Sequence, residues 1–363
     1  SYISKYSGIE TADIIVFLDG QYAVAKEGMD VDGDGILGET IAKSTDHAEV
    51  IQAAIDYLTN GGKVFIAAGV YRIASKISIT TSRITLEGAG IRTELWNVNN
   101  TDILEISGAI REVQIKNLNI NGNKAENSLG RGMVINSTFA GSDTHLLENV
   151  IVRECPENGI EIVSGTEIQM INVNVHNCGG TGIVLGSGSS DHKIVNTISF
   201  GNEGLGFSIL SSNTQLINCK AFGNSDRGFY VGGGRSQLIG CHSEENGKSG
   251  FRITVDDVRV VGCFAWNNGK GGEEREGIWI GGKRVIVISC HILDTQDSPT
   301  QIYGILLSST SSNCIVIGSV INGIPNPIIN YGSENSILRN KGYATENSGT
   351  ATIPAGSTRV TVE

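Results

Sequence analysis

The fold is decided by two successive stretches of the sequence, TQLINCKAFGNSDRGFYV at residues 214–231 and SQLIGCHSEENGKSGFRI at residues 236–253. Both have Gln-Leu-Ile near the start, a Cys two residues later and a Gly-Phe pair near the end, and equivalent residues are 22 positions apart. A unit of this length holds three short strands and three turns but is too short for a propeller blade. The pair therefore indicates a solenoid of stacked coils.

The same unit recurs on both sides of this pair. Its second half, a Gly followed by alternating residues, begins at Gly159, Gly182, Gly206, Gly228, Gly250, Gly277 and Gly304. The Leu-x-x-Leu-x-Leu frame of leucine-rich repeats is absent, and β-branched residues with Gly-bearing turns favour strands, so we predict a parallel β-helix. One repeat position is filled by Asn149, Asn172, Asn196 and Asn218. Stacked asparagines at a turn can bond between coils, which predicts a structural ladder.

Composition and charge narrow the class of protein. The 363 residues include 48 Gly and only 5 Pro, which favours many short strands, and the formal net charge is -11. Proteins that bind the phosphate backbone are normally basic, so we expect no nucleic-acid partner. No apolar run is long enough to cross a bilayer, so we expect no membrane insertion.

The seven cysteines follow the repeat. Cys219, Cys241 and Cys263 are 22 residues apart, and Cys290 follows 27 residues later. This spacing fits neither a metal-binding C-x-x-C pair nor a small disulfide scaffold. We expect the cysteines to be stacked, inward-facing small residues, with disulfides between neighbouring coils left open.

The two ends differ from the repeat, as the caps of a solenoid should. Residues 46–58 have helical apolar spacing, and Asp46 is followed three residues later by Glu49, which predicts an N-cap with a capping box. We expect this helix to cover the open end of the core. Upstream, Asp19-Gly20 between two apolar alternations predicts a hairpin. The expected organisation is an N-terminal strand and cap segment at 1–45, the β-helix at 46–340 and a linker or the start of an appended segment at 341–363.

One metal motif is present in the N-terminal segment. Asp30, Asp32 and Asp34 match the first half of an EF-hand-like loop, and Glu39 lies two residues before the position of the usual final glutamate. The alternative is an ordinary acidic turn. We expect no required cofactor, and at most a structural Ca²⁺ held by these four residues.

Several segments resemble the pectate-lyase-like superfamily. These are the stretch from Ala53 to Ile73, the segment LEGAG at 86–90 and the segment LNINGN at 118–123. The superfamily includes mannuronan epimerase catalytic modules and phage tailspike depolymerases, and the resemblance covers roughly residues 45–335. It implies an all-β, right-handed single-stranded parallel β-helix with an N-terminal capping helix. Epimerases of this kind have an Asp-Pro-His-Glu motif, of which only the acidic position remains here, as Glu161.

The repeat register also places outward-facing residues. Because alternate side chains of a strand face opposite ways, the second residue after each repeat Gly should point outward. The resulting column is Glu161, Val184, Ser208, Tyr230, Arg252, Trp279 and Leu306. Sugar rings stack on aromatic faces and Arg forks bind carboxylates, so Tyr230, Trp279 and Arg252 predict a glycan-binding face. The alternative is that these side chains pack under long loops.

Acidic residues cluster beside this column. Glu203 and Asp226 lie in turns of neighbouring coils, and Glu274 and Glu276 lie in an enlarged turn at 270–276. Glycoside hydrolysis needs two carboxylates, and our preferred pair is Glu203 with Asp226. Glu161 and Arg252 are further catalytic candidates. Tyr230, Trp279, Arg227, Glu274 and Glu276 are candidates for substrate binding.

These observations favour a polysaccharide depolymerase that works by glycoside hydrolysis. A uronate polysaccharide lyase or C5-epimerase, and a glycan-binding spike without catalysis, remain alternatives, as does a purely structural solenoid. The expected location is extracellular or on a virion, and similarity to tailspikes would imply a homotrimer. The tail from Gly349 to Thr358 looks like the start of domains appended to phage spike-like proteins, which favours the tailspike reading.

Overall fold

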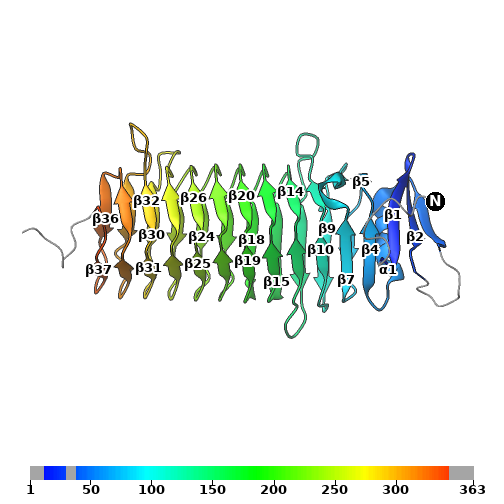
Figure 1. Cartoon of the computed structure of the whole chain (residues 1–363), viewed down its shortest axis with the longest axis horizontal. Helices are drawn as coiled ribbons and strands as arrows, with labels where there is room; N and C mark the ends of the chain where they lie inside the picture. Colours follow the sequence, from blue (N-terminus) through cyan, green and yellow to red (C-terminus); the bar gives the residue numbers. More distant parts are fainter. Residues whose placement is uncertain (1–11, 30–37, 343–363) are drawn as a thin grey trace, which may run out of the picture.

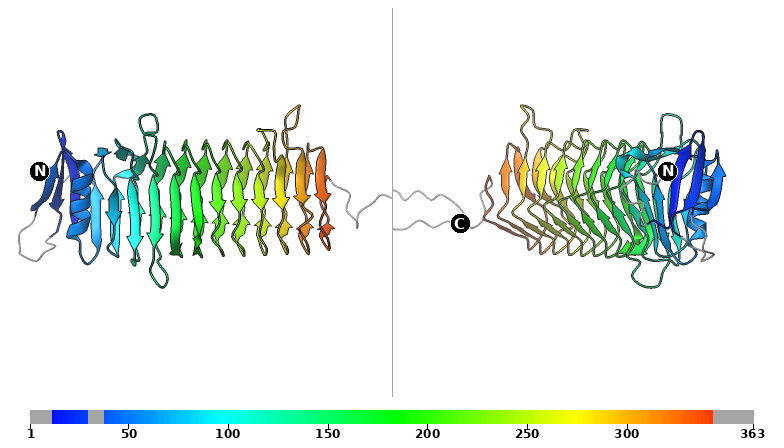
Figure 2. Two further views of the ribbon diagram at one scale, coloured as in Figure 1. Left: turned by 180° about the vertical axis from the view of Figure 1, so that it is seen from behind. Right: turned by 45° about the vertical axis from the view of Figure 1, so that its right-hand side comes forward.

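The computed structural model describes residues 12–29 and 38–342. They form a long parallel β-solenoid in which each regular coil adds one strand to each of three sheets (Figure 1). The predicted parallel β-helix is therefore confirmed. The coils are stacked along the long axis of the molecule, and the sheets form its elongated sides (Figure 2).

Sheet A starts each coil and also includes the N-terminal strands. Its order in space is β3 (Thr40–Ser44), β2 (Tyr22–Glu27), β1 (Ile14–Asp19), β4 (Gly62–Ile66), β7 (Ile84–Gly88), β10 (Gln114–Lys116), β13 (Leu146–Glu148), β16 (Gln169–Ile171), β19 (Lys193–Val195), β22 (Gln215–Ile217), β25 (Gln237–Ile239), β28 (Arg259–Val261), β31 (Ile286–Ile288), β34 (Ile315–Ile317) and β37 (Ser336–Leu338).

Sheet B follows after a sharp turn. In chain order its strands are β5 (Gly69–Ile73), β8 (Thr93–Asn97), β11 (Asn119–Asn121), β14 (Ile151–Arg153), β17 (Asn174–His176), β20 (Ile198–Phe200), β23 (Lys220–Phe222), β26 (His242–Glu244), β29 (Phe264–Trp266), β32 (His291–Leu293) and β35 (Val320–Asn322).

Sheet C completes each coil. Its strands are β6 (Ile77–Ile79), β9 (Leu104–Gly108), β12 (Met133–Ser137), β15 (Ile160–Thr166), β18 (Ile183–Ser190), β21 (Phe207–Ile209), β24 (Phe229–Val231), β27 (Phe251–Ile253), β30 (Glu276–Ile280), β33 (Tyr303–Leu307) and β36 (Asn326–Asn330). The alternating Gly-containing half of the repeat is sheet C, and the Gln-Leu-Ile half is sheet A.

The core consists of columns of identical or similar side chains. Phe207, Phe229 and Phe251 are fully buried, and their rings are stacked with centroids 4.8 and 4.9 Å apart. The ring spacing equals the strand spacing because equivalent residues of successive coils lie directly over one another. Replacing one of these rings by Ala would leave a cavity and cost about 3–5 kcal/mol.

The turn from sheet A to sheet B explains the predicted asparagine column. Asn149, Asn172, Asn196 and Asn218 have φ values of 51–55°, the left-handed region that Asn and Gly tolerate best. The same turn position holds Gly240 and Gly262, both with φ of 62°. The Asn149 side chain donates to Asn117 Oδ1 at 3.0 Å, and Asn172 donates to Asn149 at 3.2 Å. The column is therefore structural, and backbone conformation explains it as much as the side-chain bonds do.

All seven cysteines are buried and have free thiols. Burial raises the pKa of the Cys241 thiol well above its ordinary value. The expectation of inward-facing small residues is confirmed. The structure contains no disulfide between coils at these seven positions.

The N-terminal end is covered as expected. Helix α1 (His47–Tyr57) packs against the first coil through buried residues that include Val50, Ile51 and Ile55. Asp46 is its N-cap and accepts from the amides of Ala48 and Glu49. The reciprocal half of the expected capping box differs, because the amide of Asp46 donates to Ser44 Oγ at 3.1 Å.

The hairpin at the N-terminal end extends sheet A beyond the coils. Strands β1 and β2 pair antiparallel around Asp19 and Tyr22, and β1 pairs parallel with β4. Loops protrude from the stack between sheet B and sheet C at residues 122–132 and 294–302. A short 3-10 helix, η3 (Gly90–Arg92), precedes β8. Within the described residues, no helix is long and apolar enough to span a membrane.

Candidate functional site

The outward column on sheet C has the predicted register. Glu161 pairs with Val184, Ser208 with Tyr230 and Tyr230 with Arg252. Arg252 in turn pairs with Trp279. The column members are half-buried rather than fully exposed, apart from Ser208, which is buried. The alternation of side chains along each strand was therefore sufficient to place the column members on one face.

Arginine side chains cover the aromatic members of the column. The Arg252 guanidinium lies 4.0 Å from the centroid of the Trp279 ring, and that of Arg227 lies 5.7 Å from the Tyr230 ring. Such cation–π contacts hold the guanidinium planes over the rings. The face consequently combines partly covered aromatic rings with fixed hydrogen-bond donors.

One carboxylate connects the two arginines. Glu274, from the enlarged turn before β30, accepts from Arg227 Nε at 2.5 Å and from a second Arg227 nitrogen at 2.7 Å. It also pairs with Arg252 at 3.3 Å. Burial disfavours ionisation of Glu274, but hydrogen bonding to Arg227 and the charges of both arginines outweigh it and lower its pKa. Glu274 is therefore an anchored carboxylate.

Asp226 extends this network along the solenoid. Its carboxylate lies 3.3 Å from Arg227 and 3.5 Å from Lys248 Nζ. Lys248 comes from the next coil, so three consecutive coils contribute to the cluster. We call Asp226, Arg227, Lys248, Arg252 and Glu274 the ionic cluster.

Glu276 differs from every other acid of this region. It is 8% exposed, and its Oε2 atom is buried with no hydrogen-bond partner among the described residues. Burial raises the pKa of its carboxyl, hydrogen bonding and the positive charge of Arg252 oppose this only in part, and the negative charge of Glu274 makes a smaller contribution in the raising direction. Two acids separated by one residue in sequence thus have pKa values shifted in opposite directions, an arrangement typical of acid–base sites.

Glu161 belongs to a separate group. It accepts from Arg131 at 3.2 Å and from Asn158 at 3.0 Å, and Arg131 also holds Asp102 at 2.8 Å. Three coil steps separate Glu161 from Tyr230, which is roughly 14 Å along the axis. The structure does not bring Glu161 together with the ionic cluster.

Glu203 also lies apart from the cluster. Its side chain is 65% exposed and pairs with Lys124 at 3.1 Å across the turns between sheets B and C. Asp226 lies on the neighbouring coil but binds different cations. The preferred pair Glu203–Asp226 is adjacent in the stack without sharing a partner.

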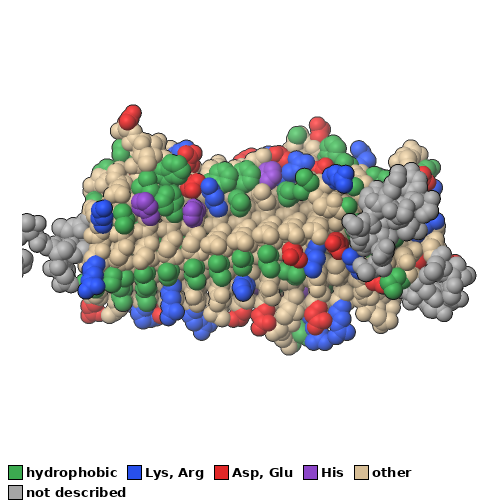
Figure 3. Space-filling model, viewed as in Figure 1, with side chains coloured by type: hydrophobic (Ala, Val, Ile, Leu, Met, Phe, Trp, Pro, Cys, Tyr) green, Lys and Arg blue, Asp and Glu red, His purple; other side chains and the backbone are tan. Residues whose placement is uncertain are grey.

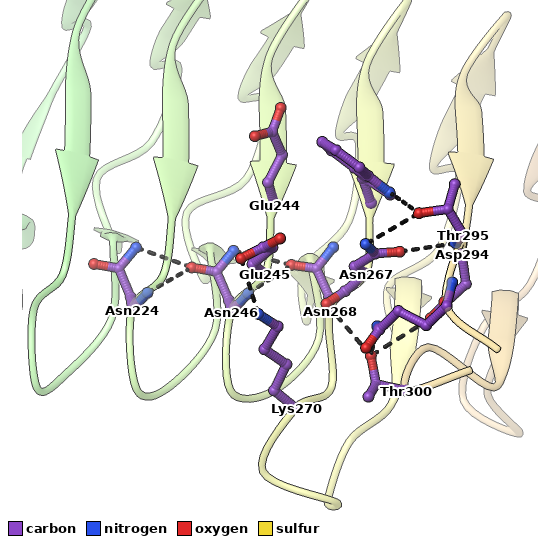
Figure 4. Close-up of polar contacts among 12 residues, drawn as sticks. Asn224, Glu244, Glu245, Asn246, Asn267, Asn268, Lys270, Asp294, Thr295 and Thr300 are labelled. Atoms are coloured by element: carbon purple, nitrogen blue, oxygen red, sulfur yellow. Dashed lines mark hydrogen bonds and ion pairs between the residues drawn. The ribbon is translucent and has the colours of Figure 1, made fainter. Parts of the chain in front are cut away.

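A buried amide ladder supports the turns that hold these acids (Figure 4). Asn202, Asn224, Asn246 and Asn268 are buried, and each donates through Nδ2 to the next amide oxygen at 2.9–3.0 Å, ending at Gln301. This ladder was not among the features predicted from the sequence. Its signal was available, because the four asparagines are 22 residues apart.

Three of the residues predicted to hold calcium, Asp30, Asp32 and Asp34, lie outside the described residues. Glu39 is described and precedes β3. Within residues 12–29 and 38–342, no group of three or more His, Cys, Asp or Glu side chains is arranged to hold a metal ion.

Comparison with solved structures shows the same architecture in proteins of low sequence identity. The A-module of mannuronan C-5 epimerase AlgE4 from Azotobacter vinelandii superposes with a TM-score of 0.70 at 19% identity, over 86% of this chain and 94% of that one. DFA-IIIase from Arthrobacter chlorophenolicus A6 superposes with a TM-score of 0.64 at 13% identity, over 84% and 96%. At these identities the similarity shows the fold.

A phage protein shows the fold as part of a longer chain. Tailspike protein 2 from a bacteriophage of Escherichia coli O157:H7 superposes with a TM-score of 0.60 at 12% identity, over 84% of this chain and 45% of that one. No curated protein sequence matches the chain. The family described as the right-handed beta helix region matches residues 158–342, which is half of the chain. The chain therefore belongs to the right-handed β-helix family.

Proposed function

We propose that this protein hydrolyses an extracellular polysaccharide on the outer face of sheet C, with Glu276 as general acid and Asp226 as general base. The observation that supports the proposal most directly is the buried Glu276 carboxyl with its raised pKa, next to the ionised Glu274. A glycosidase needs one carboxylic acid that keeps its proton and one carboxylate that has lost it.

The acid role fits the environment of Glu276. A raised pKa keeps the carboxyl protonated closer to neutral pH, where it can protonate the oxygen of a glycosidic bond as the bond breaks. Trp279 lies on the same strand as Glu276, β30, and Arg252 lies on the adjacent strand, β27. A sugar ring stacked on this part of the face would be held beside the acid. In the proposed pair, Glu276 takes the place of Glu203, and Asp226 is kept.

The base role fits the position of Asp226. Its turn and that of Glu276 are two coils apart, which corresponds to roughly 9–10 Å along the axis. Carboxyl groups about 6.5–9.5 Å apart leave room for a water molecule and produce inversion at the anomeric carbon. Arg227 and Lys248 hold the Asp226 carboxylate in place. Inverting hydrolysis is therefore the expected stereochemistry.

The names of the structural neighbours support the substrate class. They include an epimerase that acts on mannuronan, a DFA-IIIase and phage tailspikes. We further propose, from the similarity to phage tailspikes, that the protein works outside the cell or on a virion and that it forms a homotrimer in that setting. Light scattering of the purified chain tests the trimer, and a monomeric mass would contradict it.

Digestion of a polysaccharide panel tests the reaction. The panel contains mannuronan, levan, dextran and polygalacturonate, and products are separated by mass. The masses of the two products of each cleavage should together exceed the mass of the substrate by one water molecule. NMR should show inverted configuration at the anomeric carbon of the new reducing end. Glu276→Gln and Asp226→Asn should each lower the rate at least 100-fold, because general acid–base catalysis contributes about 10²–10⁴-fold.

Glu245→Gln is the matched control. Glu245 lies in the same stretch of coils but is paired with Lys270 at the surface, and its replacement should leave the rate unchanged. Unsaturated products that absorb in the ultraviolet would indicate a lyase and reject hydrolysis. Full activity in Glu276→Gln, with folding shown by circular dichroism, would reject the proposed acid.

A further inference from the structure

The outer face of sheet B carries a second group, five aromatic residues and one glutamate, that has no role in the site above. Phe222, His242, Glu244, Phe264, Trp266 and His291 come from four consecutive strands, β23, β26, β29 and β32. We call them the sheet B platform. Figure 3 shows hydrophobic and histidine side chains gathered on the surface over these strands.

Phe264 is the centre of the platform. Its ring centroid is 5.3 Å from those of His242 and His291 and 6.3 Å from that of Trp266. The interplanar angles of these pairs range from 39° to 77°, so the rings around Phe264 do not form a flat stack, whereas Phe222 is stacked on Phe200 of the preceding strand. They form a broken aromatic surface with accessible faces and edges.

Polar groups are interleaved with these rings. Lys220 pairs with Glu244 at 2.8 Å and lies 4.9 Å from the Phe222 ring centroid. Trp266 Nε1 donates to Thr295 Oγ1 at 3.0 Å. Figure 4 shows Glu244 on β26 and Thr295 just after β32, two strands further along sheet B. Next to the platform is a hollow of about 350 Å³, lined by residues that include Ile198, Lys220 and His242.

This mixture favours a sugar chain over a protein as the occupant. A dry protein interface is depleted of charge at its centre and would bury the Lys220–Glu244 pair at a desolvation cost. A polysaccharide presents C–H groups to aromatic rings and hydroxyls to charged side chains at the same time, and it needs no dry seal. The platform also runs along the solenoid axis, as an extended polymer does.

We propose that the sheet B platform is a second glycan-binding surface, separate from the catalytic face, which holds the polysaccharide substrate at a distance from the cleaved bond. The inference rests on the proposed function for the class of ligand, and it does not depend on which residues catalyse. Binding at two faces would keep the enzyme on a long polymer and add little for a short oligosaccharide.

Affinity electrophoresis tests the platform. Protein migrates through gels cast with mannuronan, levan, dextran or polygalacturonate, and retardation gives the apparent Kd. Phe264→Ala combined with Trp266→Ala should weaken binding about tenfold or more, since central aromatic residues contribute most of the binding energy at such surfaces. The rate on a short oligosaccharide should stay unchanged. Ile239→Ala, at an exposed position on sheet A, is the control and should bind as the unmodified protein does.

The outcomes separate the platform from the catalytic proposal. Glu276→Gln should lose cleavage and keep its retardation, which would support the platform independently of hydrolysis. Unchanged retardation of the Phe264/Trp266 double variant would reject the platform even if hydrolysis is shown. Absence of retardation of the unmodified protein in every gel would also reject it. If Trp279→Ala alone abolished retardation, sheet C would be the sole glycan surface.

Discussion

His192 should make the stability of the solenoid depend on pH between 4 and 6.5. Its imidazole is buried before β19, its Nδ1 accepts from the amide of Ile168 at 3.3 Å, and its Nε2 has no partner among the described residues. Burial lowers the pKa of His192 to about 4, and the charge of Asp191 opposes this only in part. An unfolded histidine titrates near 6.5.

Linkage between proton binding and folding gives the sign and size of the change in the free energy of unfolding with pH. Because the folded pKa is lowered, the unfolded chain binds the proton first, and acid favours unfolding. The contribution of the neutral imidazole is complete above about pH 6.5, declines as pH falls, and is lost below about pH 4. A difference of roughly 2.5 pKa units corresponds to about 3 kcal/mol in total, of which about 2 kcal/mol is lost between pH 7.5 and pH 5.

The test compares the unmodified chain with His192→Thr. The next coil has Thr214 at the equivalent position. The hydroxyl of Thr can accept the hydrogen bond from the amide of Ile168 in place of the His192 Nδ1 atom. Urea unfolding at pH 7.5 and pH 5 should show that the variant loses about 2 kcal/mol less than the unmodified protein. NMR titration of the imidazole should give a pKa near 4 directly. His291→Thr, at an exposed position, controls for the removal of an imidazole as such.

Coinciding pH profiles of the unmodified chain and His192→Thr would refute this reasoning, as would an imidazole that titrates near 6.5. His145 is buried in the same way before β13, and burial lowers its pKa as well. It should add a smaller dependence of the same sign, which His192→Thr leaves in place.

Three further results are expected. Asn246→Ala breaks the amide ladder on both sides and should lower the unfolding free energy by about 2–4 kcal/mol, whereas Asn322→Ala, at an exposed position of sheet B, should have little effect in the same urea titration. Arg227→Lys replaces the bidentate bond to Glu274 by a point charge and should reduce hydrolysis about tenfold with unchanged circular dichroism; an unchanged rate would show that the anchoring of Glu274 is irrelevant to catalysis. If the predicted acidic loop binds calcium, Ca²⁺ should raise the melting temperature relative to EGTA, and Asp32→Asn should remove that difference; equal melting temperatures in Ca²⁺ and EGTA would contradict a calcium site.

The difference between Glu203 and Asp226 could not be predicted from the sequence. Glu203 and Asp226 appeared equivalent, since both lie in turns of the repeat. In the structure Glu203 is an exposed partner of Lys124, 79 residues away, whereas Asp226 belongs to a cluster with Arg227 and Lys248. Pairings over such separations depend on which turns protrude and fold back, and the local pattern does not contain this information.

The sequence by itself determined the solenoid, the strand register and the outward column from Glu161 to Trp279. A 22-residue period and strict alternation leave a single way to stack the coils with the apolar residues inside. It also located the capping helix and the structural asparagine turn. Only the tertiary structure showed that Glu276 is buried while Glu274 is anchored by two arginines. The reason is physical, because a pKa depends on the solvent and charge that surround a group in three dimensions. Two glutamates with a single residue between them, Glu274 and Glu276, therefore have pKa values shifted in opposite directions.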